Sequence, residues 1–129
     1  MSAEVRGLLA GLTILVVEDD YYQAVDTKEA FERAGATIAG PFSNAAAALA
    51  AVEQIPPDCA VIDIDLGDGP SFDLARDLKK RGIPTVFVSG YQATVLPSDL
   101  RDLALLEKPA EAPLLVKAVS EVALRSGHQ

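Results

Sequence analysis

The sequence contains one cysteine, one histidine and no tryptophan, and these scarcities exclude several classes of chemistry. With Cys59 alone, the chain can form neither an internal disulfide nor a thiolate metal cluster. Cys59 adjoins an apolar run, so we interpret it as a small core residue and not as a reactive thiol. His128 lies in a polar tail where fraying is expected, so we do not expect a histidine-based catalytic mechanism.

Long apolar runs and an excess of basic residues are also missing. The run GLLAGLTILVV is too short to span a membrane, and it lacks the flanking residues of a signal peptide. Eleven basic residues against 19 acidic ones give a formal net charge of -8, which argues against direct binding to nucleic acid or anionic membranes. We therefore expect a cytoplasmic protein whose partners are proteins or cations.

The sequence does contain five short apolar runs, with helical patterns between them. The runs lie at 13–17, 37–41, 60–62, 85–89 and 103–107. None of them alternates between apolar and polar residues, which is typical of strands in a parallel sheet that helices cover on both faces. The pattern predicts an α/β fold, the flavodoxin-like (βα)5 doubly wound parallel sheet with strand order 2-1-3-4-5.

The segments between these runs carry recognisable helix signals. Gly35 ends the first helical pattern, and Ser43 or Asn44 is placed to cap the second. Pro70 is expected at the start of the third. Pro97 lies inside the fourth, so we expect that helix to be short or irregular. We expect a single domain over residues 1–129, with a core of about residues 12–125.

Charged and hydroxyl side chains occur at the ends of the strands that border the point where the strand order reverses. In chain order they are Glu18, Asp19, Asp20, Asp63, Asp65, Ser89 and Lys108. Open parallel sheets bind ligands at this edge. Converging carboxylates suit Mg²⁺, and a lysine opposite them would neutralise a transferred phosphoryl group. Together they meet the requirements for phosphoryl transfer onto an aspartate.

The motifs ILVVEDD, AVIDIDL, VFVSG and LEKP stand in this order at the predicted strand ends. With these four motifs, the chain resembles the receiver domains of bacterial two-component response regulators. The resemblance covers about Leu12 to Arg125. The resemblance implies that Asp63 is the phosphoacceptor and that Asp19 is a direct ligand of Mg²⁺ or Mn²⁺. It further implies that Glu18 is the other member of the acidic pair and that the backbone carbonyl of Asp65 completes the metal shell.

The resemblance also implies roles for residues after the last two strands. Ser89 matches the switch hydroxyl of the family, and Lys108 matches its lysine, followed by Pro109 in what is usually a cis peptide bond. Asp20 falls outside the site, where it would cap the first helix.

The chain departs from the family pattern close to the switch residue. Leu105 stands where an aromatic residue is common, so the usual aromatic readout is absent, and Tyr91 could replace it or be a plain surface residue. Gly90 replaces a small alanine, which leaves space around the phosphoryl site.

The resemblance implies a stand-alone receiver that accepts a phosphoryl group from a histidine kinase or a histidine phosphotransfer protein. It would signal through contacts with an unidentified protein target or act as a phosphate shuttle or sink. It could also form a homodimer. Beyond self-phosphorylation from a phosphodonor and autodephosphorylation, it would not be an enzyme.

Two other interpretations stay open at the sequence level. The acids could form only a solvated rim on a receiver-like interaction module that does not depend on phosphorylation. VIDIDLGDG also looks like the Asp-x-Asp loop of haloacid dehalogenase-type phosphatases, with Asp63 as nucleophile and Asp65 as acid-base. Those enzymes place the nucleophile on the first strand, whereas here an acidic pair precedes Asp63 by two crossovers.

Overall fold

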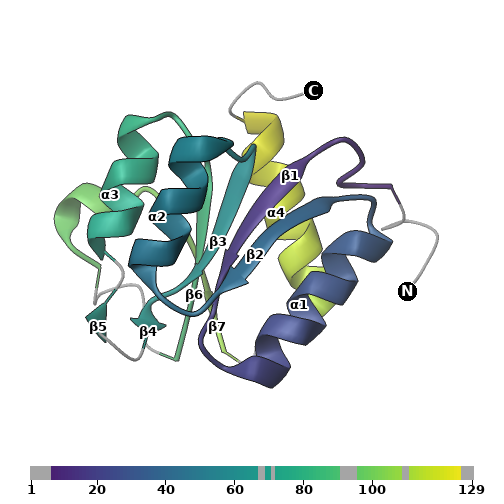
Figure 1. The fold of residues 1–129 in the computed structure, drawn as a ribbon, viewed down its shortest axis with the longest axis horizontal. Helices are drawn as coiled ribbons and strands as arrows, with labels where there is room; N and C mark the ends of the chain where they lie inside the picture. The colour runs from purple at the N-terminus through teal and green to yellow at the C-terminus, as the bar shows by residue number, and fades with distance from the viewer. Residues whose placement is uncertain (1–6, 67–68, 71, 91–95, 109–110, 126–129) are drawn as a thin grey trace.

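The computed structural model describes residues 7–66, 69–70, 72–90, 96–108 and 111–125. Five parallel strands form its central sheet, in the order β2-β1-β3-β6-β7 (Figure 1). They are β1 (Thr13–Val17), β2 (Thr37–Phe42), β3 (Cys59–Asp63), β6 (Thr85–Ser89) and β7 (Ala104–Glu107). This order confirms the predicted flavodoxin-like topology, because these strands are the first to fifth of the predicted pattern in sequence.

Helices cover both faces of the sheet. They are α1 (Tyr21–Arg33), α2 (Ala45–Gln54), α3 (Phe72–Lys80) and α4 (Ala112–Arg125), and a short 3-10 helix, η2 (Ser98–Leu100), precedes β7. α1 and α4 lie on one face and α2 and α3 on the other (Figure 1). Among the described residues, no helix is both long enough and apolar enough to cross a lipid bilayer.

Successive strand residues point to opposite faces, so each strand contributes to two cores. In β1, Ile14 and Val16 pack with α1 and α4, whereas Leu15 and Val17 pack with α2 and α3. Such strands carry apolar residues on both faces, which is why the runs did not alternate. Cys59 is fully buried in the first core, and burial, followed by the nearby charge of Asp58, raises the pKa of its thiol to about 12.

The helix boundaries follow local capping chemistry. Asp20 caps α1 by accepting a hydrogen bond from the Gln23 amide at 3.0 Å. After α1, Gly35 adopts a φ of 99°, a backbone conformation that costs glycine little. Of the two candidate caps for α2, Asn44 does the capping, accepting from the Ala47 amide at 2.8 Å.

The expectation that Pro70 starts the third helix is wrong. α3 begins at Phe72, and Pro70 lies in a two-residue strand, β5 (Gly69–Pro70), which pairs antiparallel with β4 (Asp65–Leu66). The fixed φ of proline suits an edge strand as well as a first helical turn, so the hairpin pairing decides its place. The short fourth helix is confirmed as η2, which begins directly after Pro97.

Candidate phosphoacceptor site

Asp63 is the last residue of β3, in the middle of the sheet edge where the parallel strands end. β1 lies beside β3 with Val17 opposite Ile62, so the next residue of the β1 strand, Glu18, emerges beside Asp63. One carboxylate oxygen from each of Glu18, Asp19 and Asp63 lies within 4.8 Å of the others. The parallel register thus brings Asp63 close to two acids that precede it by 44 residues or more in the sequence.

Lys108 approaches the same carboxylates from the other side. Its backbone amide donates to the carbonyl of Ser89 at 2.7 Å, which prolongs the pairing of β6 with β7. From there its Nζ lies 3.0 Å from Asp63 Oδ2 and 3.6 Å from Glu18 Oε1. The ammonium group therefore offsets part of the repulsion between the two carboxylates.

The ionisation of Glu18 is strongly affected by this environment. Its side chain is only 9 % exposed and that of Asp63 only 2 %. Burial, a side-chain hydrogen bond with Asp63 and the charge of Asp63 raise the pKa of Glu18 to about 7, against the lowering effects of the Asp20 backbone amide and of Lys108. Partial burial would lower the pKa of Lys108, but its contacts with Asp63 and Glu18 outweigh this and raise it.

These residues fit a hard divalent cation. Three carboxylates share one small space, and burial, with a smaller contribution from Asp63, disfavours the charged form of Glu18 and raises its pKa. Mg²⁺ prefers such oxygen ligands and keeps several waters. Asp65, the expected carbonyl ligand, lies in β4 two residues after Asp63, opposite Pro70 of β5.

Asp20 stands apart from this cluster although it adjoins Asp19. Its side chain caps α1, and its backbone amide donates to Glu18 Oε2 at 3.0 Å. This amide contact orients Glu18. It could not be predicted from the sequence, because every residue except proline has a backbone N–H, whatever its side chain.

Ser89 ends β6 and is fully buried, opposite Glu107 of β7. Gly90 is exposed, and a Cβ built on it would meet nothing within 4 Å. Leu105 lies opposite Phe87 and packs against the core shared with α2 and α3. Tyr91 and Pro109, including the cis bond expected before Pro109, lie outside the described residues.

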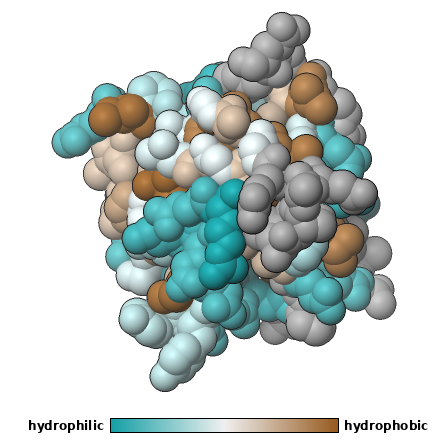
Figure 2. All heavy atoms as spheres, turned by 90° about the vertical axis from the view of Figure 1, so that its right-hand side faces the viewer, coloured by the Kyte–Doolittle hydropathy of each residue, from teal (hydrophilic) through white to brown (hydrophobic). Residues whose placement is uncertain are grey.

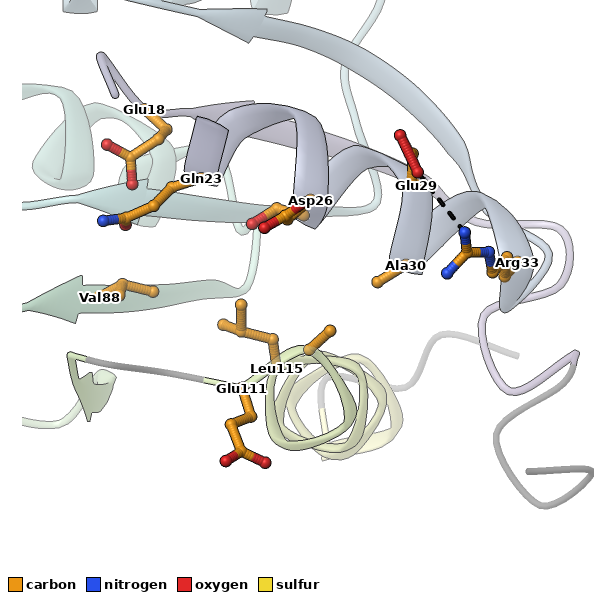
Figure 3. Close-up of a pocket in the computed structure, with 11 residues that line it drawn as sticks. Glu18, Gln23, Asp26, Glu29, Ala30, Arg33, Val88, Glu111 and Leu115 are labelled. Atoms are coloured by element: carbon orange, nitrogen blue, oxygen red, sulfur yellow. Dashed lines mark ion pairs between the residues drawn. The ribbon is translucent and has the colours of Figure 1, made fainter. Parts of the chain in front are cut away.

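Sequence reasoning also missed a groove that begins at Glu18 and runs between α1 and α4 (Figure 3). Its lining comes mainly from the length of α1 and the first turn of α4, which lie far apart in the chain, and no motif marks it.

Known proteins share this arrangement of strands and helices. Residues 14–120 match the family described as response regulator receiver domain. A response regulator receiver protein from Sinorhizobium medicae WSM419 is 26 % identical, with a TM-score of 0.78 over 89 % of this chain and 96 % of that one. A comparison with curated proteins gave no match.

Two further solved structures, less than 25 % identical, support the fold. The receiver domain of PhyR from Erythrobacter litoralis is 22 % identical, with a TM-score of 0.80 over 93 % of this chain and 95 % of that one. A mutant of the anti-anti-sigma factor PhyR from Bartonella quintana is 20 % identical, with a TM-score of 0.81. The match covers 92 % of this chain but only 51 % of that protein, so the chain spans about half its length. With the family match extending over most of the sequence, the chain belongs to the response regulator receiver domains, the signalling domains of two-component systems.

Proposed function

We propose that this receiver domain accepts a phosphoryl group on Asp63, in the cytoplasm, from a histidine kinase or a histidine phosphotransfer protein. The observation that supports this most directly is the position of Lys108 Nζ, 3.0 Å from Asp63 Oδ2 and 3.6 Å from Glu18 Oε1. A buried carboxylate with a lysine and neighbouring metal-type ligands is suited to nucleophilic attack on phosphorus.

The transfer makes one bond and breaks one. An oxygen of the Asp63 carboxylate forms a bond to phosphorus while the bond from phosphorus to the donor imidazole nitrogen breaks, and the nitrogen keeps the electron pair. Lys108 then exchanges part of its contact with Asp63 for a phosphoryl oxygen. Mg²⁺, or Mn²⁺ in its place, held by Glu18, Asp19, Asp63 and the Asp65 carbonyl, would supply charge neutralisation for the phosphoryl oxygens.

The signal would leave the site through β6 and β7. Ser89 is the proposed switch hydroxyl, and its carbonyl already receives the Lys108 amide, so a shift of either residue is transmitted to the other. Leu105, Gly90, Tyr91 and Pro109 complete the proposed readout segment. The readout would be a changed affinity for a protein target, or onward transfer of the phosphoryl group as a shuttle or sink.

Phosphorylation is tested by incubating the protein with Mg²⁺ and acetyl phosphate and recording its intact mass. We expect the addition of a single phosphoryl group, lost with EDTA and in Asp63→Asn. The matched control is Asp20→Asn, because asparagine also caps helices and Asp20 lies outside the proposed site.

The outcomes separate the remaining interpretations. Absence of any mass gain, with Asp20→Asn and wild type both folded, would support an interaction module that does not use phosphate. Turnover of many equivalents of a phosphate ester would instead support a phosphatase. Either result would refute the proposal.

A further inference from the structure

The edge strand β2 does not pair with β1 in a regular ladder. Leu15 lies opposite Ala39, but Val17 lies opposite Phe42, so two steps along β1 correspond to three steps along β2. β2 therefore contains one extra residue between these two pairs, which is a β-bulge. Without the extra residue, Pro41 would lie opposite Val17, where proline has no N–H to donate to the ladder, and the bulge places Phe42 there instead.

Gly40 makes this bulge possible. Its φ is 106°, a backbone conformation that residues with a Cβ rarely adopt. A Cβ built on it would lie 2.8 Å from the Phe42 amide nitrogen and 2.9 Å from the Val16 carbonyl oxygen. Both are backbone atoms of the paired strands, so a side chain at position 40 fits only if β2 moves away from β1 at this point.

The bulge adjoins the phosphoacceptor cluster. The carbonyl of Phe42 accepts a hydrogen bond from the Glu18 amide at 2.9 Å, which extends the pairing of β1 with β2 by one residue. The side chain of Glu18 is held separately, by the Asp20 amide at 3.0 Å and beside Lys108 Nζ at 3.6 Å. The Phe42 carbonyl thus fixes the backbone at the point where Glu18 and Asp19 enter the carboxylate cluster.

Contacts just outside the ligands of a metal orient those ligands, and their loss lowers the metal affinity. Building on the proposed phosphoacceptor function, we propose that Gly40 is a positioning residue for the metal site, because it permits the bulge that places the Phe42 carbonyl on the Glu18 amide. The face of the molecule that includes α1 is a broad hydrophilic area beside smaller apolar ones (Figure 2), and it belongs to the helix layer and not to the sheet that contains Gly40. A substitution of Gly40 therefore tests the sheet without changing the side chains of that outer face.

Hydrogen exchange followed by NMR in EDTA tests the bulge without metal or phosphodonor. The Glu18 amide should be protected in the wild type. Gly40→Ala should speed its exchange about tenfold relative to that of the Ile62 amide in the central strand β3, a ratio that removes any change in global stability. A Glu18 amide that exchanges in the wild type as fast as an unprotected loop amide would overturn the proposal, even if Gly40→Ala did not fold.

Titration with Mg²⁺ measures the consequence at the ligands. Gly40→Ala should weaken Mg²⁺ binding by about tenfold, as expected when a contact that orients metal ligands is lost. Phosphorylation by acetyl phosphate should then need more Mg²⁺ but reach the wild-type rate at saturation, because the substitution leaves every ligand in the chain. Unchanged Mg²⁺ affinity in a folded Gly40→Ala variant would overturn the proposal.

The matched control is Gly82→Ala. Gly82 also has a positive φ, 73°, but it lies between α3 and β6, at the edge of the sheet opposite Asp63. This variant should also lose stability, yet keep the wild-type Mg²⁺ affinity and Glu18 exchange. Equal weakening of Mg²⁺ binding in Gly82→Ala would overturn the proposal. Absence of phosphoryl uptake by the wild type would refute only the proposed function, because the exchange and Mg²⁺ measurements need no phosphodonor.

Discussion

At the scale of single residues, the position of Glu18 disfavours the ionised form of its own side chain. It is nearly buried beside Asp63, and that environment raises its pKa to about 7. The charge of Lys108 lowers the pKa of Glu18 but does not cancel the effect of burial. A proton and a divalent cation are therefore alternative ways to neutralise the same group, and they should compete.

This competition predicts a pH dependence of stability in the metal-free protein. Because the pKa of Glu18 is higher in the folded state than its ordinary value of 4.5, the folded state binds this proton more tightly. Its contribution to the free energy of unfolding should thus fall as pH rises from about 4.5 to about 7 and then stay constant.

Thermal melting in EDTA at a series of pH values measures this effect. The difference in Tm between Glu18→Gln and wild type should grow in favour of the variant over that pH range. A difference independent of pH would contradict the assigned environment of Glu18.

At the scale of elements, ion pairs hold η2 against α3. Arg76 Nε donates to Asp99 Oδ2 at 2.9 Å, and Lys79 Nζ donates to the Asp99 carbonyl at 2.6 Å and to Asp102 Oδ1 at 2.9 Å. The hydrogen bond from Arg76 lowers the pKa of the Asp99 carboxyl. These contacts position the short helix that the described residues contain between β6 and β7, downstream of the proposed switch residue Ser89.

We expect Arg76→Gln/Lys79→Gln to loosen η2 much more than it destabilises the whole domain. Exposed ion pairs contribute little to global stability, but local opening depends on the few contacts that hold a segment. Hydrogen exchange of residues 96–103 should become faster while Tm changes little.

Lys80→Gln, on the same helix and exposed, is the control for loss of positive charge and should leave exchange unchanged. Unchanged exchange in the double variant would show that η2 is held by the burial of Leu96 and Leu100 instead.

At the scale of the whole molecule, negative charge is unevenly distributed, with acids gathered at one edge of the sheet and along the groove. A cation that binds only the folded state stabilises it by mass action. At a free Mg²⁺ concentration one hundred times its Kd, the free energy of unfolding should rise by about 2.7 kcal/mol.

Calorimetry with and without Mg²⁺ tests this, with NaCl at equal ionic strength to account for general screening. Asp19→Asn should abolish the gain, whereas Asp20→Asn should keep it. A gain of equal size with NaCl would show that screening, and not a metal site, explains the stabilisation.

Much of the fold could be predicted from residue patterns alone. Runs such as TILVV and TVFVS indicate strands that are buried on both faces, and Asp20, Gly35 and Asn44 mark helix ends through local hydrogen bonding and backbone preference. The acids after β1 and β3 could be assigned to one edge because parallel strands end together.

What the sequence by itself determined was therefore the order of elements and the set of groups at the sheet edge, because both depend on local periodicity and topology. Only the tertiary structure decided that Pro70 joins a hairpin, that Glu18 is buried enough to raise its pKa to about 7, and that α1 and α4 enclose an acid-rimmed groove. Pairing, burial and enclosure depend on residues distant in the chain, so no local pattern contains them.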